Sequence, residues 1–158
     1  MFTITTNALT HKLLLFYNHL QRKERETIGR VTPQMLEKYA STRRLHTLLN
    51  DKDPLGYIIA NDTSRHPART IYPGDMRIYI ACIDYDARRH LHGTMLVDHI
   101  AELARLSQLQ RIGLWCAEGI PAHDFWTSIG FTPGRTREGG QKRNRTHVEY
   151  TRAVDFPH

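Results

Sequence analysis

The stretch DARRHLHGTML at residues 86–96 gathers side chains that can hold an anion. These side chains belong to Arg88, Arg89, His90 and His92, and Gly93 and Thr94 follow them. The apolar run MRIYIACIDY ends just before the stretch and predicts a buried strand, while the apolar spacing after it predicts a helix. A turn between a strand and a helix collects unpaired backbone N–H groups at the positive end of the helix dipole, and Gly93 permits close backbone approach. The pattern favours a turn that binds a pyrophosphate, with solvated arginines at an ordinary connection as the alternative.

Two carboxylates, Asp84 and Asp86, end the same predicted strand. There they can accept a proton from an ammonium group, directly or through water, or they can cap the following turn and helix. Tyr85 and His123 are further candidates for carrying that proton. With the two histidines of the turn, the aspartates also form a cluster of metal-ligand types. The two guanidinium groups beside this cluster disfavour a cation, so we expect no metal there.

Hydrophobic periodicity and turn residues predict the elements that position these groups. The order is a strand, two helices, a hairpin, a central strand, a helix, a strand, a helix and a final strand. The predicted strands are 2–5, the hairpin of 44–50 with 55–61, the central strand 76–85, and 111–117 and 146–154. The predicted helices are 8–25, 32–41, one ending near Gln110, and 121–131. Asn7 is the expected cap of the first helix, and Thr32 is that of the second, with Pro33 in its first turn. The hairpin predicts antiparallel pairing, and the later strand–helix–strand crossover predicts a parallel pair. We therefore expect an α+β fold with a mixed, mostly antiparallel central sheet flanked by helices, in one domain over residues 1–158.

Composition narrows the class of protein. The chain has 158 residues, of which 40% are hydrophobic and 24% charged, as in soluble globular domains. No apolar run approaches the roughly 20 residues that a transmembrane helix needs, so we expect no membrane association. Cys82 and Cys116 fit no pairing pattern and lie in apolar runs, which predicts buried free thiols and a cytoplasmic location. A formal net charge of +6 favours an anionic ligand or partner.

The order of these motifs resembles the acetyl-CoA-binding core of the GNAT N-acetyltransferase superfamily. In that family a central strand leads into an Arg/Gln-x-x-Gly-x-Gly/Ala turn, and residues 88–93 stand at the matching place. Further along, the family commonly carries an alanine, then Phe-Tyr, then Gly-Phe. The corresponding residues here are Ala122, Phe125-Trp126 and Gly130-Phe131. The resemblance implies the GNAT-like acyl-CoA N-acyltransferase fold for the whole chain.

The resemblance also implies an N-acetyltransferase that moves an acetyl group from acetyl-CoA directly to an amine. It implies contacts with coenzyme A for Cys82, Ile83, Arg88, Arg89, His90, Leu91, His92, Gly93 and Thr94, and chemical roles for Asp84, Asp86 and Trp126. Leu91 stands where the family has a glycine, and a residue with negative φ can still turn its N–H toward the phosphate. Trp126 stands where the family's tyrosine often protonates the departing thiolate, and an indole N–H is no acid near neutral pH. The proton then comes from elsewhere, or the thiolate leaves unassisted, because a thiol pKa near about 8.5 makes a fair leaving group.

The basic segment RTREGGQKRNRTH, residues 135–147, lies roughly where the family's last loop borders the acceptor side. It can steer an anionic acceptor, including nucleic acid or a charged tRNA, although it has no aromatic residue between Arg135 and Arg145 to stack on bases. A solvated loop is the alternative interpretation. Two other functions stay open: a catalytically altered GNAT-fold module that binds nucleic acid through this segment, and a tRNA-acetylating toxin. The sequence does not name the acceptor, and a homodimer stays open as well.

Overall fold

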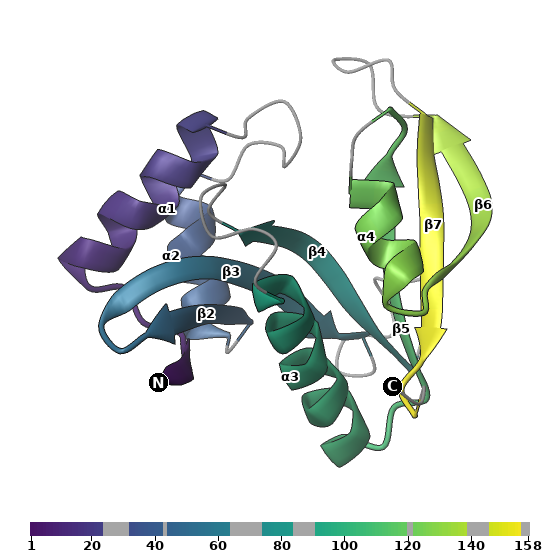
Figure 1. The fold of residues 1–158 in the computed structure, drawn as a ribbon, viewed down its shortest axis with the longest axis horizontal. Coiled ribbons are helices and arrows are strands. Elements are labelled where there is room, and N and C mark those ends of the chain that lie inside the picture. The colour runs from purple at the N-terminus through teal and green to yellow at the C-terminus, as the bar shows by residue number, and fades with distance from the viewer. Residues whose placement is uncertain are drawn as a thin grey trace. The chain divides into compact units, whose positions relative to one another are not determined.

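A computed structural model describes residues 1–23, 32–42, 44–63, 74–83, 91–119, 122–138 and 146–155. Its helices and strands are labelled in Figure 1. In chain order they are β1 (Phe2–Thr6), α1 (His11–Lys23), α2 (Pro33–Ser41), β2 (Leu45–Asn50), β3 (Asp53–Asp62), β4 (Asp75–Ile83), α3 (His92–Leu106), β5 (Arg111–Ala117), α4 (Ala122–Ser128), β6 (Thr132–Glu138) and β7 (Thr146–Ala153).

The strands follow the order β1-β2-β3-β4-β5-β7-β6 in the sheet. β2 pairs antiparallel with β1 and β3, and β7 pairs antiparallel with β5 and β6. β4 and β5 pair in parallel, because the chain returns between them through α3. The predicted α+β fold with a mixed, mostly antiparallel sheet is therefore confirmed.

The chain divides into two compact units. Unit 1 comprises Met1–Ala60 and Ile80–His99, and unit 2 comprises Asn61–Tyr79 and Ile100–His158. The boundary between them passes through β4 and through α3. The assignment of residues 1–158 to a single domain stays a prediction.

In unit 1, α1 and α2 bury their apolar stripes against β2 and β3 (Figure 1). The buried side chains of this core are Leu13, Phe16, Tyr17, Leu20, Leu36, Ala40, Leu45, Tyr57, Ile59 and Cys82. α2 begins as predicted, because the Thr32 hydroxyl accepts a hydrogen bond from the Met35 N–H at 3.2 Å and Pro33 occupies the first turn.

The first helix begins later than predicted, and Asn7 does not cap it. Asn7 adopts a left-handed conformation with φ 62°, and its side-chain oxygen accepts a hydrogen bond from the Leu45 N–H at 3.2 Å. It therefore ties the end of β1 to the start of β2. Thr10 takes the capping role instead, since its hydroxyl accepts from the Leu13 N–H at 3.3 Å.

In unit 2, the short helix α4 lies beside β5 and β7 (Figure 1). It closes as predicted, with Gly130 at φ 95° just after its last turn. β6 was not predicted, because Pro133 and Gly134 read as turn residues and every residue of the strand is exposed. Its hydrogen bonds to β7 make it a strand, so the segment interpreted as a loop over 135–147 begins as an edge strand.

Candidate functional site

The start of α3 in unit 1 brings several backbone N–H donors together. The first bond of the helix runs from the Met95 N–H to the Leu91 carbonyl at 3.0 Å. The N–H groups of His92, Gly93 and Thr94 precede it, and helix geometry leaves such groups without partners inside the helix. The dipole of this 15-residue helix adds partial positive charge at the same end. Three of the residues predicted to contact coenzyme A therefore present an anion-binding arrangement of amides.

Leu91 lies in the left-handed region of backbone conformation. Its φ is +63°, so it does not adopt the negative φ considered from the sequence. Its side chain is 71% exposed and packs little. The family pattern places a glycine here, and the backbone keeps the conformation that glycine adopts without strain. A leucine in this region costs roughly 1–2 kcal/mol, which other interactions of the folded chain have to offset.

Substitutions at Leu91 should separate backbone strain from packing. Leu91→Gly is expected to change the free energy of unfolding by less than about 1 kcal/mol, because relief of strain offsets the added freedom of the unfolded chain. Leu91→Val should cost about 1 kcal/mol or more, since a β-branched residue fits the left-handed region poorly. Urea denaturation measures both. Leu106, the last residue of α3, is 66% exposed and has no positive φ, so Leu106→Val is the control and should cost only a few tenths of a kcal/mol. Equal costs of the valine substitutions at the two sites would contradict backbone strain at Leu91.

Other predicted contacts of coenzyme A in unit 1 have buried side chains. His92 is 6% exposed, and its ring lies 5.2 Å from the ring of Phe2, centroid to centroid. Cys82 is 2% exposed and belongs to the core beneath α1 and α2. A ligand at this place would therefore not meet the exposed face of either side chain. Ile83 is the last residue of β4.

Six residues singled out from the sequence lie outside the described residues. They are Asp84, Tyr85, Asp86, Arg88, Arg89 and His90.

Trp126 belongs to the core of unit 2. It is 6% exposed and makes edge-on contacts with Phe125 and Phe131, at centroid distances of 4.9 and 5.2 Å. The aromatic pair and the Gly-Phe pair quoted from the sequence therefore pack against one another. This packing is a sufficient reason for a large aromatic residue at this position.

His123, at the start of α4, joins β5 to β7. Its Nε2 lies 2.8 Å from the Ala117 carbonyl oxygen, and its Nδ1 lies 2.6 Å from the Tyr150 hydroxyl. A carbonyl can only accept, so Nε2 donates its proton to Ala117, and Nδ1 is the nitrogen that faces the Tyr150 hydroxyl. The Cys116 thiol is 3.8 Å from the same Nε2, and burial raises its pKa to about 11. The thiol therefore stays protonated at neutral pH and is no nucleophile.

Unit 2 also contains a buried ion-pair cluster that the sequence reasoning missed. Arg77 Nη1 lies 3.1 Å from Glu149 Oε2 and 3.7 Å from Asp75 Oδ2. Arg135 and Arg111 pair with the same two carboxylates, at 2.9 Å to Glu149 and 3.0 Å to Asp75. The lone arginine inside the apolar run MRIYIACIDY was the available signal, because a charge in a buried strand requires a buried partner.

A histidine pair in unit 1 was missed as well. His46 Nδ1 lies 3.2 Å from His99 Nε2 and 3.1 Å from the Thr6 hydroxyl. Burial lowers the pKa of His46 to about 4, with the charge of His99 as the second cause, and burial also lowers the pKa of His99. Both rings are therefore neutral at pH 7. No local sequence pattern predicts this histidine pair, because its two members lie 53 residues apart.

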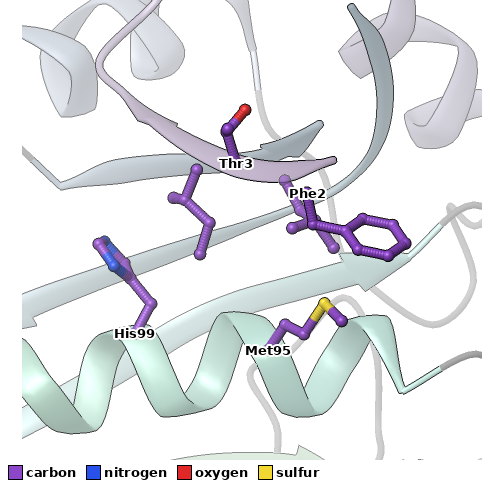
Figure 2. Close-up of a pocket in the computed structure, with 6 residues that line it drawn as sticks. Phe2, Thr3, Met95 and His99 are labelled. Atoms are coloured by element: carbon purple, nitrogen blue, oxygen red, sulfur yellow. The ribbon is translucent and has the colours of Figure 1, made fainter. Parts of the chain in front are cut away.

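An open, largely apolar pocket of about 400 Å³ reaches His99 in unit 1. Figure 2 shows Met95 and His99 projecting from α3 toward β1, which carries Phe2 and Thr3. Ile4 and Leu48 complete its lining. None of the residues predicted from the sequence to contact a ligand lines this pocket, although Phe2 of its lining also contacts the ring of His92.

Comparison with solved structures defines the class of fold. The chain is similar to the Ard1 protein of Thermoplasma volcanium, with 16% identity, a TM-score of 0.79 and 97% of each chain covered. It is also similar to the ribosomal-protein-S18-alanine N-acetyltransferase of Escherichia coli, with 14% identity, a TM-score of 0.67, and 100% of this chain and 97% of that chain covered. A third similar structure is the N-acetylglutamate synthase of Neisseria gonorrhoeae complexed with coenzyme A and N-acetyl-glutamate, with 15% identity and a TM-score of 0.76. That match covers 99% of this chain and 36% of the synthase. The chain thus has the acyl-CoA N-acyltransferase fold.

The family follows from the sequence profile of the acetyltransferase (GNAT) family, which matches residues 13–131. The chain belongs to the GNAT acetyltransferase family. No curated protein sequence matches it. As a member of this family it is an acyl-CoA-dependent N-acyltransferase with acetyl-CoA as co-substrate. None of the helices in the described part of the chain has the length and hydropathy needed to span a bilayer.

Proposed function

We propose that the protein transfers the acetyl group of acetyl-CoA directly to the amine of an acceptor, and that the start of α3 holds the pyrophosphate of coenzyme A. The observation that carries the proposal is the start of α3 directly after Leu91, whose left-handed conformation matches the glycine of the family turn. An anion at this point receives N–H donors and the positive end of the helix dipole. Arg88, Arg89 and His90 precede these amides in the sequence and would add positive charge.

The reaction needs a neutral amine, a donor to the oxyanion and a route for one proton. The amine nitrogen attacks the thioester carbonyl carbon, a C–N bond forms, and the C–S bond then breaks to release the coenzyme A thiolate. By the family resemblance, backbone N–H groups of Cys82 and Ile83 at the end of β4 would contact the thioester and pantetheine. Asp84 or Asp86 would take the proton from the ammonium group, directly or through water.

The thiolate receives no proton from Trp126 in this proposal. An indole N–H is no acid near neutral pH, and the ring is packed between Phe125 and Phe131. Because a thiol of pKa about 8.5 is a fair leaving group, the thiolate can depart unassisted and be protonated by water. The role proposed for Trp126 is to shape the core beneath α4 rather than to move a proton.

Acetyl-CoA should stabilise the full chain. At a ligand concentration of about 100 times Kd, we expect the melting temperature to rise by roughly 5–10 °C, because binding to the folded state adds about 2.7 kcal/mol. Arg88→Glu should remove the shift without changing the melting temperature of the free protein. Arg105→Gln, at an exposed arginine paired with Glu102, is the matched control and should keep the shift. An unchanged melting temperature at millimolar acetyl-CoA would overturn the proposal, and thiol release with a panel of amines would then test turnover.

Location and assembly stay predictions. Cys82 and Cys116 are free and buried, which is compatible with the reducing cytoplasm predicted from the sequence. Homodimer formation and binding of nucleic acid stay open, and residues 139–145 of the basic segment lie outside the described residues.

A further inference from the structure

One arginine of unit 2 is held in a defined orientation by an aromatic ring. The guanidinium carbon of Arg137 on β6 lies 4.3 Å from the centroid of the Trp115 ring on β5, and that of Arg135 lies 5.9 Å from it. A guanidinium that stacks on an indole keeps its in-plane N–H donors free for a second ligand. The sequence offered no aromatic partner inside the basic segment, and the fold supplies one from a strand 22 residues earlier in the chain.

The carboxylates near this ring are already engaged. Glu149 accepts from Arg77 and Arg135, and Asp75 pairs with Arg77 and Arg111. Within the described part of the chain, three guanidinium groups therefore share these two carboxylates. Among the described residues Arg137 has no carboxylate partner, so it adds an uncompensated positive charge beside a cluster that is already positive.

A second polar group lies next to Arg137. His147 on β7 is the direct register partner of Arg137 on β6 and of Ala117 on β5. Residues opposite one another in adjacent strands project from the same face, so the imidazole lies beside the stem of Arg137. Its Nδ1 is buried and makes no hydrogen bond to any described residue. Hydrogen-bonding capacity is therefore unused at the same place as the unpaired charge.

We propose that Arg137, stacked on Trp115, binds an oxyanion group of the amine acceptor, either a carboxylate or a phosphate. The planar fork of a guanidinium matches both groups with two parallel hydrogen bonds, and the excess positive charge is complementary to either. The assignment to the acceptor rests on the proposed acetyl transfer. The anion site itself rests only on the geometry of unit 2.

Equilibrium binding to the full chain tests the site without any turnover. Inorganic phosphate and glutarate are titrated while the indole N–H signal of Trp115 is followed by NMR, with Trp115→Phe identifying that signal. We expect a saturable shift that Arg137→Gln weakens at least about tenfold. Arg137→Lys should bind with intermediate affinity, since an ammonium lacks the planar fork. Arg105→Gln is the control and should behave as the unmodified chain, whereas a shift that persists in Arg137→Gln would overturn the site.

Kinetics with matched amines tests the assignment to the acceptor. The pairs are β-alanine with β-alaninamide, and phosphoethanolamine with ethanolamine, which also separate a carboxylate from a phosphate. Arg137→Gln should raise the KM of the charged member of one pair at least about tenfold and leave kcat and the neutral member unchanged. Equal effects on both members would overturn the assignment. If acetyl-CoA neither binds nor turns over while phosphate still binds through Arg137, the proposed function fails and the anion site stands.

Discussion

Replacing Glu149 with glutamine is expected to lower the free energy of unfolding by about 3 kcal/mol. Glu149 is 6% exposed and holds the guanidinium groups of Arg77 and Arg135. The substitution keeps the volume but removes the charge, so Arg77 stays buried with Asp75 at 3.7 Å as its one carboxylate among the described residues. Breaking one side of a buried pair costs far more than the pair itself contributes, because the remaining charge is left desolvated. Urea denaturation at pH 7 measures the change through the midpoint and slope.

Two further variants make this result specific to the cluster. Gly113 faces Arg77 so closely that a Cβ there would overlap the guanidinium, so Gly113→Ala should also destabilise the protein by displacing the same group. Glu102→Gln removes a carboxylate from the exposed pair with Arg105 and should leave the midpoint unchanged. If Glu149→Gln behaves like Glu102→Gln, the buried cluster does not contribute to stability as argued.

Acidification should destabilise the protein through His46. Its pKa is lowered to about 4 in the folded protein by burial and by His99, against about 6.5 in the unfolded chain. Between these values the unfolded chain binds a proton that the folded protein excludes. The stabilisation is therefore fully present above pH 6.5 and is lost as the pH falls toward 4. The two pKa values correspond to about 3 kcal/mol for this group alone.

The comparison of variants isolates this contribution from that of the carboxylates. The free energy of unfolding is measured between pH 7.5 and 4.5 for the unmodified chain and for His46→Asn, whose amide oxygen can still accept a hydrogen bond at the Nδ1 position. Over this pH interval His46→Asn should lose roughly 2 kcal/mol less of its free energy of unfolding than the unmodified chain loses, whatever the stability of the variant at pH 7. His11→Asn, at an exposed histidine of α1, is the control and should run parallel to the unmodified chain. Parallel curves for all three proteins would contradict the role of His46.

Local patterns predicted most of the elements, because each depends on neighbours in sequence. The run RIGLWCA became β5 with the predicted bounds, and Thr32 and Pro33 started α2 as expected. The Phe125-Trp126 and Gly130-Phe131 motifs pointed to the family, and in the fold their rings pack together. Asn7 and β6 were the failures, since an asparagine can serve a left-handed bend as well as a cap and an exposed edge strand has no hydrophobic alternation.

The candidate site likewise has features that could be predicted from the sequence and features that could not. The helix that opens with His92, Gly93 and Thr94 was readable from residue types, because helix amides and a glycine act through the local backbone. The conformation of Leu91 was not readable, since a leucine favours a negative φ and only the folded structure shows φ +63°. The proton of His123 was equally unreadable, as the Ala117 carbonyl and the Tyr150 hydroxyl decide which nitrogen carries it.

By itself the sequence determined the order of helices and strands apart from β6, the class of fold and the GNAT family, and it predicted a turn that would bind pyrophosphate. The tertiary structure alone decided which distant groups meet: His46 with His99, Arg77 with Glu149, and Arg137 with Trp115. The physical reason is the sequence separation over which each kind of interaction acts. Periodicity and capping act over a few residues, whereas hydrogen bonds, ion pairs and ring stacking depend on strand register, which joins residues that are 22 to 72 positions apart in these pairs.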